Sequence, residues 1–327
     1  MARSVQTRFL IISDTHDIDL TEYTRPAVAS GSINEHGNKS LPEVDVVLHC
    51  GDITENGGIE NYRRSIEGLA SIKAELKLVI AGNHDIDLDR VYYEQECGGK
   101  DESAMTDKAM ALWRSKIATD RGIVFLEEGT HQFELSTGAT FKLYASPYTP
   151  AYGLSAFQYP SKEDRFNSSG TPPYAVNVST ETSTIPPLVD IVMTHGPPKY
   201  VLDGCGGGSR TSGGCEHLRR AVCLAKPILH CFGHIHSAWG ARRAAWDTRT
   251  NNGKRKSTDD DIELLPEEFI GKNSSRKRGY ASLSPATYEQ LRPGEQTLFV
   301  NAAVGNIDGE MGNVPWIVVL GLKRNES

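Results

Sequence analysis

The chain has 327 residues, of which 38% are hydrophobic and 24% are charged, and this composition is typical of a folded globular protein rather than a disordered one. Its formal net charge of -7 argues against a protein that binds the phosphates of duplex nucleic acid over a broad surface. No apolar run is long enough to cross a bilayer, so no membrane partner is expected.

The N-terminal segment and the cysteines indicate a reducing compartment. Residues 1–7 are polar and the apolar run Phe9–Ile12 is too short for the core of a signal peptide. Cys50, Cys223 and Cys231 stand in apolar contexts that are typical of buried thiols. We therefore expect a cytoplasmic or nuclear protein.

The N-terminal half alternates between strand and helix patterns. Short apolar runs predict strands at residues 9–12, 44–50 and 78–81. Apolar residues at helical spacing predict a crossover helix at 59–75 and a second helix at 102–117. A strand at 123–126 follows, and then a hairpin joins 132–135 to 140–144 around a Ser-Thr-Gly turn.

The C-terminal half continues this alternation after an irregular segment. Residues 146–187 are rich in Pro, Ser, Thr and Tyr, which predicts a long surface loop. Strands at 189–193 and 227–232 flank a helix at 216–224, and strands at 297–304 and 316–322 are expected to close a second sheet. We interpret the polar residues 247–292 as an exposed insertion within a single domain that covers 1–327.

Five of the predicted strands end in side chains that can bind a metal. In chain order these side chains are Asp14 and His16, then Asp52, then Asn83 and His84, then His195, and finally His234 and His236. Each could alone cap a helix or sit in the core. Because strand–helix alternation gathers strand ends on one edge of a sheet, we expect them to lie together. Oxygen and imidazole ligands favour Mn, Fe, Zn or Co over Ca or Mg.

The order of these motifs resembles that of the calcineurin-like metallophosphoesterases. The matching blocks are Asp14-Thr15-His16, Gly51-Asp52, Gly82-Asn83-His84-Asp85, His195-Gly196 and Gly233-His234-Ile235-His236. The resemblance implies an α/β fold, a four-layer αββα sandwich of two mixed β-sheets flanked by helices. It also implies a phosphoester hydrolase with two divalent metal ions, for which we expect manganese.

The same resemblance assigns a role to each residue of the motifs. Asp14, His16 and His236 would bind the first metal, Asn83, His195 and His234 would bind the second, and Asp52 would bridge the two. His84 would contact the phosphate and act as general acid, with Asp85 oriented to support it. The partner would be a small phosphoester substrate.

Some subfamilies are excluded by residues that this chain lacks. Serine/threonine protein phosphatases carry Val-Asp-Arg-Gly after Gly-Asp, where this chain continues Ile53-Thr54-Glu55, and they carry Arg where Ala81 stands. Purple acid phosphatases place Tyr at the position of Glu55. The narrower resemblance, over residues 49–57, 79–84, 146–148, 194–198 and 232–236, is to the MPPED-type metallophosphoesterase domain proteins. It implies hydrolysis of small phosphodiesters such as cyclic nucleotides. The alternatives are a phosphomonoesterase or nuclease on the same site, or a metal-binding scaffold with low turnover.

Residues near the motifs carry further expectations. Gly204–Gly214 lacks the Gly-Lys-Ser/Thr of a P-loop, so we expect a rim near the metals with Arg210 as a candidate phosphate contact. His49 should support a ligand rather than bind metal itself. Tyr148, Phe157 and Trp239 could stack on a substrate ring, although packing is the expected role of each. The oligomeric state stays open.

Overall fold

A computed structural model describes residues 4–21, 41–96, 102–205, 211–246, 262–265, 275, 278–305 and 312–325 of the chain. Four parallel strands form the first half of its central sheet: β1 (Ser4–Ile12), β2 (Val46–His49), β3 (Leu76–Val79) and β4 (Ile123–Phe125). β2 is buried at every position, as is typical of parallel strands that are covered on both faces. β1 also pairs antiparallel with the C-terminal strand β18 (Trp316–Arg324).

The second half of the sheet is built in the same way. Its parallel strands are β6 (Ala139–Ser146), β11 (Ile191–Thr194), β14 (Leu229–Phe232) and β17 (Gln296–Asn301). β15 (Gly240–Trp246) and β16 (Ile262–Leu264) extend it antiparallel from β17, and β5 (Gly129–Glu134) forms the predicted hairpin with β6. The end of β18 also pairs with β6, so both halves are hydrogen-bonded into one 12-stranded sheet.

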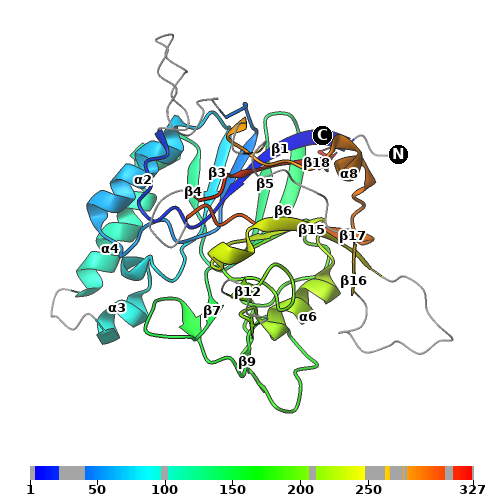
Figure 1. Ribbon diagram of the computed structural model, residues 1–327. Coiled ribbons are helices and arrows are strands. Elements are labelled where there is room, and N and C mark those ends of the chain that lie inside the picture. The colour runs from blue at the N-terminus through cyan, green and yellow to red at the C-terminus, as the bar shows by residue number, and fades with distance from the viewer. Residues whose placement is uncertain are drawn as a thin grey trace, which may run out of the picture.

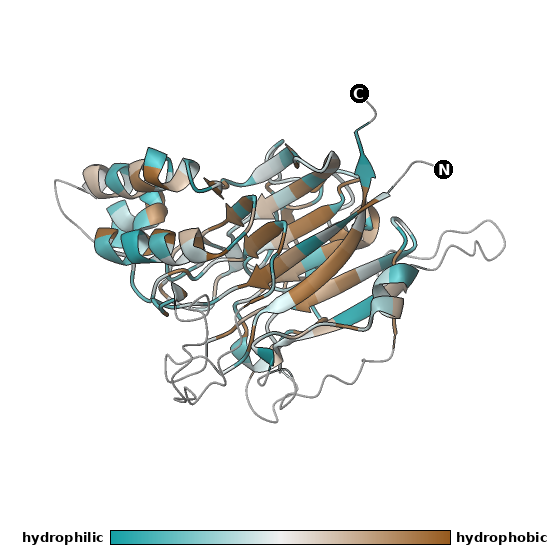
Figure 2. Ribbon diagram, turned by 90° about the horizontal axis from the view of Figure 1, so that it is seen from above, coloured by the Kyte–Doolittle hydropathy of each residue, from teal (hydrophilic) through white to brown (hydrophobic). Residues whose placement is uncertain are grey.

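The two halves of the sheet pack face to face. One buried cluster contains Phe9 and Leu78 from the first half together with Leu143 and Leu298 from the second. Since side chains of a strand alternate between its faces, the residues between these positions point outward to the helices. Figure 2 shows the apolar strands at the centre of the molecule.

Helices cover the two outer faces of the sheet (Figure 1). α2 (Ile59–Ser71) and α4 (Glu102–Trp113) pack on the first half, where Tyr62 and Trp113 are buried against its strands. α6 (Glu216–Ala225) packs on the second half through an apolar stripe that includes Leu218 and Val222. The layers therefore confirm the predicted αββα sandwich, with β18 joining its two sheets.

Shorter elements complete the fold. They are the helices α3 (Arg90–Glu96), α5 (Lys116–Thr119) and α8 (Pro285–Gln290), the 3-10 turns η1 (Ile86–Leu88) and η2 (His236–Ala238), and the strands β7 (Thr149–Pro150), β8 (Gln158–Tyr159), β9 (Glu163–Asp164), β10 (Val176–Asn177), β12 (Gly204–Cys205) and β13 (Thr211–Ser212). Over the described ranges, every helix is too short or too polar to span a membrane.

The prediction of an exposed insertion over residues 247–292 is wrong for its last part. Ala281, Leu283 and Leu291 are buried in the cluster between the two sheets, and the Tyr288 hydroxyl donates a hydrogen bond to the Ile317 carbonyl at 2.7 Å. A few apolar residues spaced along the segment make these contacts. They were missed because the prediction rested on the mostly polar composition of the whole segment. Residues 247–261, 266–274 and 276–277 lie outside the described residues.

Candidate metal centre

The polar residues that follow five strands meet at one edge of the sandwich. They follow β1 (Asp14 and His16), β2 (Asp52), β3 (Asn83 and His84), β11 (His195) and β14 (His234 and His236). The Asp14 amide donates to the Gly51 carbonyl at 2.9 Å, and the Gly233 amide donates to the His195 carbonyl at 2.9 Å. The structure thus brings all seven predicted metal ligands together from both halves of the sheet.

Asp14, His16 and His236 form the first group of donors. One donor atom from each lies within 4.8 Å of the others. His236 Nε2 is 3.2 Å from Asp14 Oδ1 and 3.4 Å from His16 Nε2. Burial raises the pKa of the Asp14 carboxyl, but the hydrogen bond from His236 and the charge of His195 outweigh burial, so that the pKa is lowered. An ionised carboxylate with two imidazoles is a donor set for a transition metal.

Asp52, His195 and His234 form the second group, and Asn83 joins it. His195 Nδ1 lies 2.9 Å from the Cys50 carbonyl, which can only accept, so Nδ1 carries a proton. The neutral ring then has a lone pair on Nε2. That atom faces two more acceptors, Asn83 Oδ1 at 3.0 Å and Asp52 Oδ2 at 3.2 Å.

The orientation of the Asn83 amide is fixed by Ser155. The Ser155 hydroxyl donates to the Asn83 carbonyl at 2.7 Å and accepts from Asn83 Nδ2 at 3.0 Å, which leaves Oδ1 toward His195. Three lone-pair atoms therefore converge on one point, and they repel one another unless a proton or a cation lies between them. Burial lowers the pKa of His195, but the negative charge of Asp52 outweighs burial and raises the pKa to about 9. Without a metal, a proton on Nε2 therefore separates the three atoms. The residues fit a metal cation at that point.

Asp52 lies between the two groups. Its Oδ2 is 3.2 Å from His195 Nε2 and 3.8 Å from His16 Nε2, while its Oδ1 accepts the His84 amide at 2.9 Å. Burial raises the pKa of this carboxyl, but the charge of His195 outweighs burial and the pKa is lowered. A buried, ionised carboxylate placed between two donor groups matches the predicted bridge.

The loops that carry these donors have strained backbones. Asp14, His16, Asp52 and His234 have φ angles of 57°, 41°, 50° and 69°, in the left-handed region that non-glycine residues rarely adopt. Such strain costs of order 1–3 kcal/mol per residue and is typical of functional sites. A Cβ atom at Gly233 would overlap the Asp14 carboxylate, so only glycine lets the loop after β14 approach this closely.

His84 lies beside the first group without belonging to it. Its ring centroid is 4.8 Å from that of His16, and its side chain is 35% exposed. His84 Nδ1 is 2.8 Å from the Glu55 carbonyl, an acceptor, so Nδ1 carries a proton and Nε2 is left for a ligand or a substrate. This placement suits a proton donor at the open side of the site, and the role of His84 stays a prediction.

The prediction that Asp85 supports the His84 ring is wrong. Asp85 is fully buried, and its carboxylate accepts hydrogen bonds from the amides of Ile53, Thr54 and Gly82 and from the Thr54 hydroxyl, at 2.8–3.1 Å. Asp85 therefore ties the loop after Asp52 to the strand end before Asn83.

Glu55 is a site residue that the motif comparison missed. Its Oε2 lies 2.8 Å from His16 Nδ1 and its Oε1 lies 3.8 Å from His84 Nδ1. A carboxylate behind a metal-binding histidine fixes the ring and its tautomer. The signal for Glu55 was its position three residues after Asp52, on the same loop.

His49 has the predicted supporting place. It is fully buried, and its Nε2 lies 2.9 Å from the Thr15 hydroxyl, which donates onward to the Ile53 carbonyl at 3.1 Å. Burial lowers the pKa of His49 to about 4, so the ring is neutral and donates to Thr15. His49 thus holds the turn between Asp14 and His16.

The other aromatic and glycine-rich candidates have distinct places. Trp239 packs against Trp316, with ring centroids 5.1 Å apart, and Tyr148 packs against Phe157 at 5.6 Å, which agrees with packing roles. The hairpin of β12 and β13 lies beside the centre, because the Ser237 hydroxyl donates to the Gly204 carbonyl at 2.8 Å. Arg210 lies outside the described residues.

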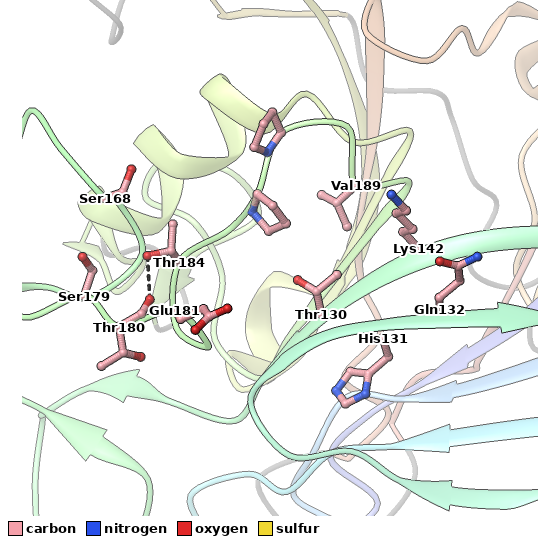
Figure 3. Close-up of a pocket in the computed structure, with 12 residues that line it drawn as sticks. Thr130, His131, Gln132, Lys142, Ser168, Ser179, Thr180, Glu181, Thr184 and Val189 are labelled. Carbon is pink, nitrogen blue, oxygen red and sulfur yellow. Dashed lines mark hydrogen bonds between the residues drawn. The ribbon is translucent and has the colours of Figure 1, made fainter.

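A separate groove of about 750 Å³ lies between the β5–β6 hairpin and residues 168–189 (Figure 3). Its lining residues include Thr130, Lys142 and Glu181, and it contains none of the predicted metal ligands. The groove is therefore distinct from the metal centre.

Comparisons with known proteins identify the family of this chain. The family model for calcineurin-like phosphoesterases matches residues 7–238. "Metallophosphoesterase domain-containing protein 1" of Homo sapiens is 27% identical over 75% of this chain and 65% of its own length. "Probable rhamnogalacturonate lyase C" of Emericella nidulans is 33% identical over 73% of this chain but only 18% of its own length. The chain thus spans less than two-thirds of these relatives. "Probable cyclic nucleotide phosphodiesterase" of Ruthia magnifica is 39% identical over 24% of this chain and 33% of its own length.

Proposed function

The chain belongs to the calcineurin-like phosphoesterase family, and on this premise we propose that it is a dinuclear-metal-dependent hydrolase of small phosphodiesters such as cyclic nucleotides. The observation that carries the proposal is the convergence of His195 Nε2, Asn83 Oδ1 and Asp52 Oδ2 on one point, where a bound metal cation can take the place of the proton on His195 Nε2. The group of Asp14, His16 and His236 beside it supplies the second set of donors.

The donor residues determine where metal cations would lie and thus where the negative charge of the phosphodiester would be neutralised. When bound, two divalent cations would neutralise the negative charge of a phosphodiester and make a water molecule acidic enough to attack at neutral pH. Asp52 would be shared between the two positions, since its Oδ2 lies within 4 Å of both His195 and His16. Manganese is the proposed metal, and the mixture of carboxylate and amide oxygens with imidazoles suits it, as it also suits Fe, Zn and Co.

His84 would supply the proton that the leaving group needs. Its Nδ1 proton is engaged by the Glu55 carbonyl, so the proton to be transferred is on Nε2 of the imidazolium. Imidazole exchanges protons near neutral pH, which suits it to general acid catalysis. The partly exposed side chain leaves room for a substrate at its free face.

Two features favour a diester over a monoester or a phosphoprotein. Both His234 and His236 are present, as in phosphodiesterase-type members of the family, and the loop after Asp52 lacks the Arg-Gly signature of the protein phosphatases. A relative that matches 24% of the chain carries the name of a cyclic nucleotide phosphodiesterase. The complete donor set argues against the scaffold alternative, since a scaffold has no need of a full set.

The test is turnover by metal-stripped protein after addition of Mn²⁺, on bis(p-nitrophenyl) phosphate, p-nitrophenyl phosphate, 2′,3′- and 3′,5′-cyclic nucleotides and a phosphoserine peptide. We expect diesters to be cleaved faster than the monoester and the peptide. Asp52→Asn is the matched control, because it removes one charge with little change of shape. A clear preference for the phosphopeptide, or equal rates in wild type and control, would reverse the assignment.

A further inference from the structure

The loop between β7 and β8 is anchored beside the second group of donors. The Ala156 amide donates to the Asn83 carbonyl at 3.1 Å, in addition to the two hydrogen bonds that join Ser155 to Asn83. At the other side of the loop, the Ala151 amide donates to the Tyr159 carbonyl at 2.8 Å. Both ends of the loop are therefore held, and its tip is fixed next to a predicted metal ligand.

The tip of this loop presents two large side chains to solvent. Tyr152 is 62% exposed and Leu154 is 83% exposed. The Tyr152 ring centroid is 5.1 Å from that of His234, with the ring planes at 64°. Exposed apolar side chains beside a polar reaction site are typical of surfaces that a ligand covers.

Tyr152 offers a flat, uncharged ring beside the donors. A phenol is ordinarily protonated at neutral pH, so the ring brings no charge to the site.

Tyr152 and His84 lie at opposite groups of donors. His84 is next to His16 in the first group, whereas Tyr152 is next to His234 in the second. If His84 gives its proton to the leaving oxygen, the attacking water lies opposite that oxygen in an in-line displacement, and the retained ester oxygen lies between the two, away from His84. The retained group is then the part of a diester that Tyr152 can contact.

We propose that Tyr152 forms a subsite for the retained ester group of a phosphodiester, and that this subsite prefers a flat ring, such as an aryl group or a nucleobase, to a small alkyl group. The inference rests on the proposed phosphodiesterase function. Stacking on an aromatic side chain is tolerant of ring identity, so the subsite would select rings as a class.

The test compares two substrates that share a leaving group. Methyl p-nitrophenyl phosphate and phenyl p-nitrophenyl phosphate both release p-nitrophenolate and differ only in the retained group. Tyr152→Ala should raise KM for the phenyl substrate about 10-fold, with kcat and the methyl substrate nearly unchanged. Tyr152→Phe should keep the preference for phenyl. Tyr174→Ala is the matched control, since Tyr174 is 61% exposed on the loop near α6.

Equal losses on both substrates, or a Tyr152→Phe variant as impaired as Tyr152→Ala, would overturn the proposal. Metal content should be the same in all variants, and loss of metal in Tyr152→Ala would instead make the residue a support of the centre. If wild type cleaves neither diester, the proposed function fails. Binding then decides the subsite: phenylphosphonate should bind the Mn²⁺-loaded protein more tightly than methylphosphonate only while Tyr152 is present, and equal binding to wild type refutes it.

Discussion

Replacing Asp85 by Asn tests whether this residue holds the metal loops or assists His84. The two carboxylate oxygens accept four hydrogen bonds: Oδ1 from the Thr54 amide and hydroxyl, and Oδ2 from the amides of Ile53 and Gly82. Burial raises the pKa of Asp85, and Asp52 adds to this rise, whereas the backbone hydrogen bonds oppose it. Loss of the charge is therefore not the main cost of Asp85→Asn; loss of an acceptor is.

The loss of stability in Asp85→Asn depends on which carboxylate oxygen of Asp85 is replaced by the amide nitrogen of Asn. If the nitrogen replaces Oδ2, it faces the amides of Ile53 and Gly82, which then have no acceptor. If the nitrogen replaces Oδ1, only the Thr54 amide loses its acceptor, because the Thr54 hydroxyl can rotate and accept a hydrogen bond from the new nitrogen. Each buried donor left unpaired costs about 1–3 kcal/mol, so even the milder arrangement should lower the free energy of unfolding by about 1–3 kcal/mol.

The assay combines urea unfolding of the metal-free proteins with metal content by atomic emission. Asp85→Asn should be less stable and should retain fewer than two metals, because the bonds it loses fix Asp52 and the strand end before Asn83. His84→Ala is the control and should keep both stability and metals. An Asp85→Asn variant with wild-type stability and metal content that fails only on substrates with poor leaving groups would refute this reasoning and return Asp85 to a role beside His84.

Other residues give further expected outcomes. Glu55→Gln should weaken Mn²⁺ binding about 10-fold in calorimetric titration, because the carboxylate behind His16 is lost, and unchanged affinity would contradict that role. His84→Ala should lower turnover by about 10²–10⁴, and less for p-nitrophenolate, which needs little protonation; loss of metal instead would make His84 a ligand. Burial lowers the pKa of His230 from 6.5 to about 3, so its contribution to stability is present above pH 6.5 and is lost as the pH falls toward 3. His230→Phe should therefore make the urea stability of the metal-free protein less steep in that window, by up to about 1.4 kcal/mol per pH unit, and an unchanged slope would show that His230 is already charged.

The ligands of the centre could be predicted because each lies directly after an apolar strand. Asp14, Asp52, Asn83, His195 and His234 each lie within four residues of the end of a buried strand, and parallel pairing then forces these ends together. The four-layer fold followed from the same alternation of strands and helices. The order of strands and polar residues along the chain was sufficient to predict the ligands, because the geometry of a parallel sheet brings the strand ends together.

Contacts between distant segments could not be predicted in this way. Asp85 accepts from amides 31 and 32 residues earlier, and Ser155 fixes Asn83 from 72 residues later. Neither partner carries a pattern of its own, since backbone amides are present at almost every position. The buried residues of 278–292 were missed for a related reason, because three apolar side chains within a polar segment give no periodicity.

Tyr152 shows the limit of composition as a guide to a site. Its segment has the Pro, Ser, Thr and Tyr content of an ordinary surface loop, and most of its neighbours are exposed. The hydrogen bonds to Asn83 and the contact between the Tyr152 and His234 rings place the loop beside the metal centre. Aromatic residues in the motifs, such as Tyr148, turned out to pack inside the protein.

The most direct test of the account is a titration of metal-stripped protein with Mn²⁺, with bound metal and hydrolysis of bis(p-nitrophenyl) phosphate measured in the same samples. The account predicts two metals per chain and turnover that reaches its maximum as the second site fills. Asp52→Asn, which removes the carboxylate between the two groups, should lose both together. Full turnover in the presence of chelator, or maximal turnover with a single bound metal, would contradict the dinuclear centre.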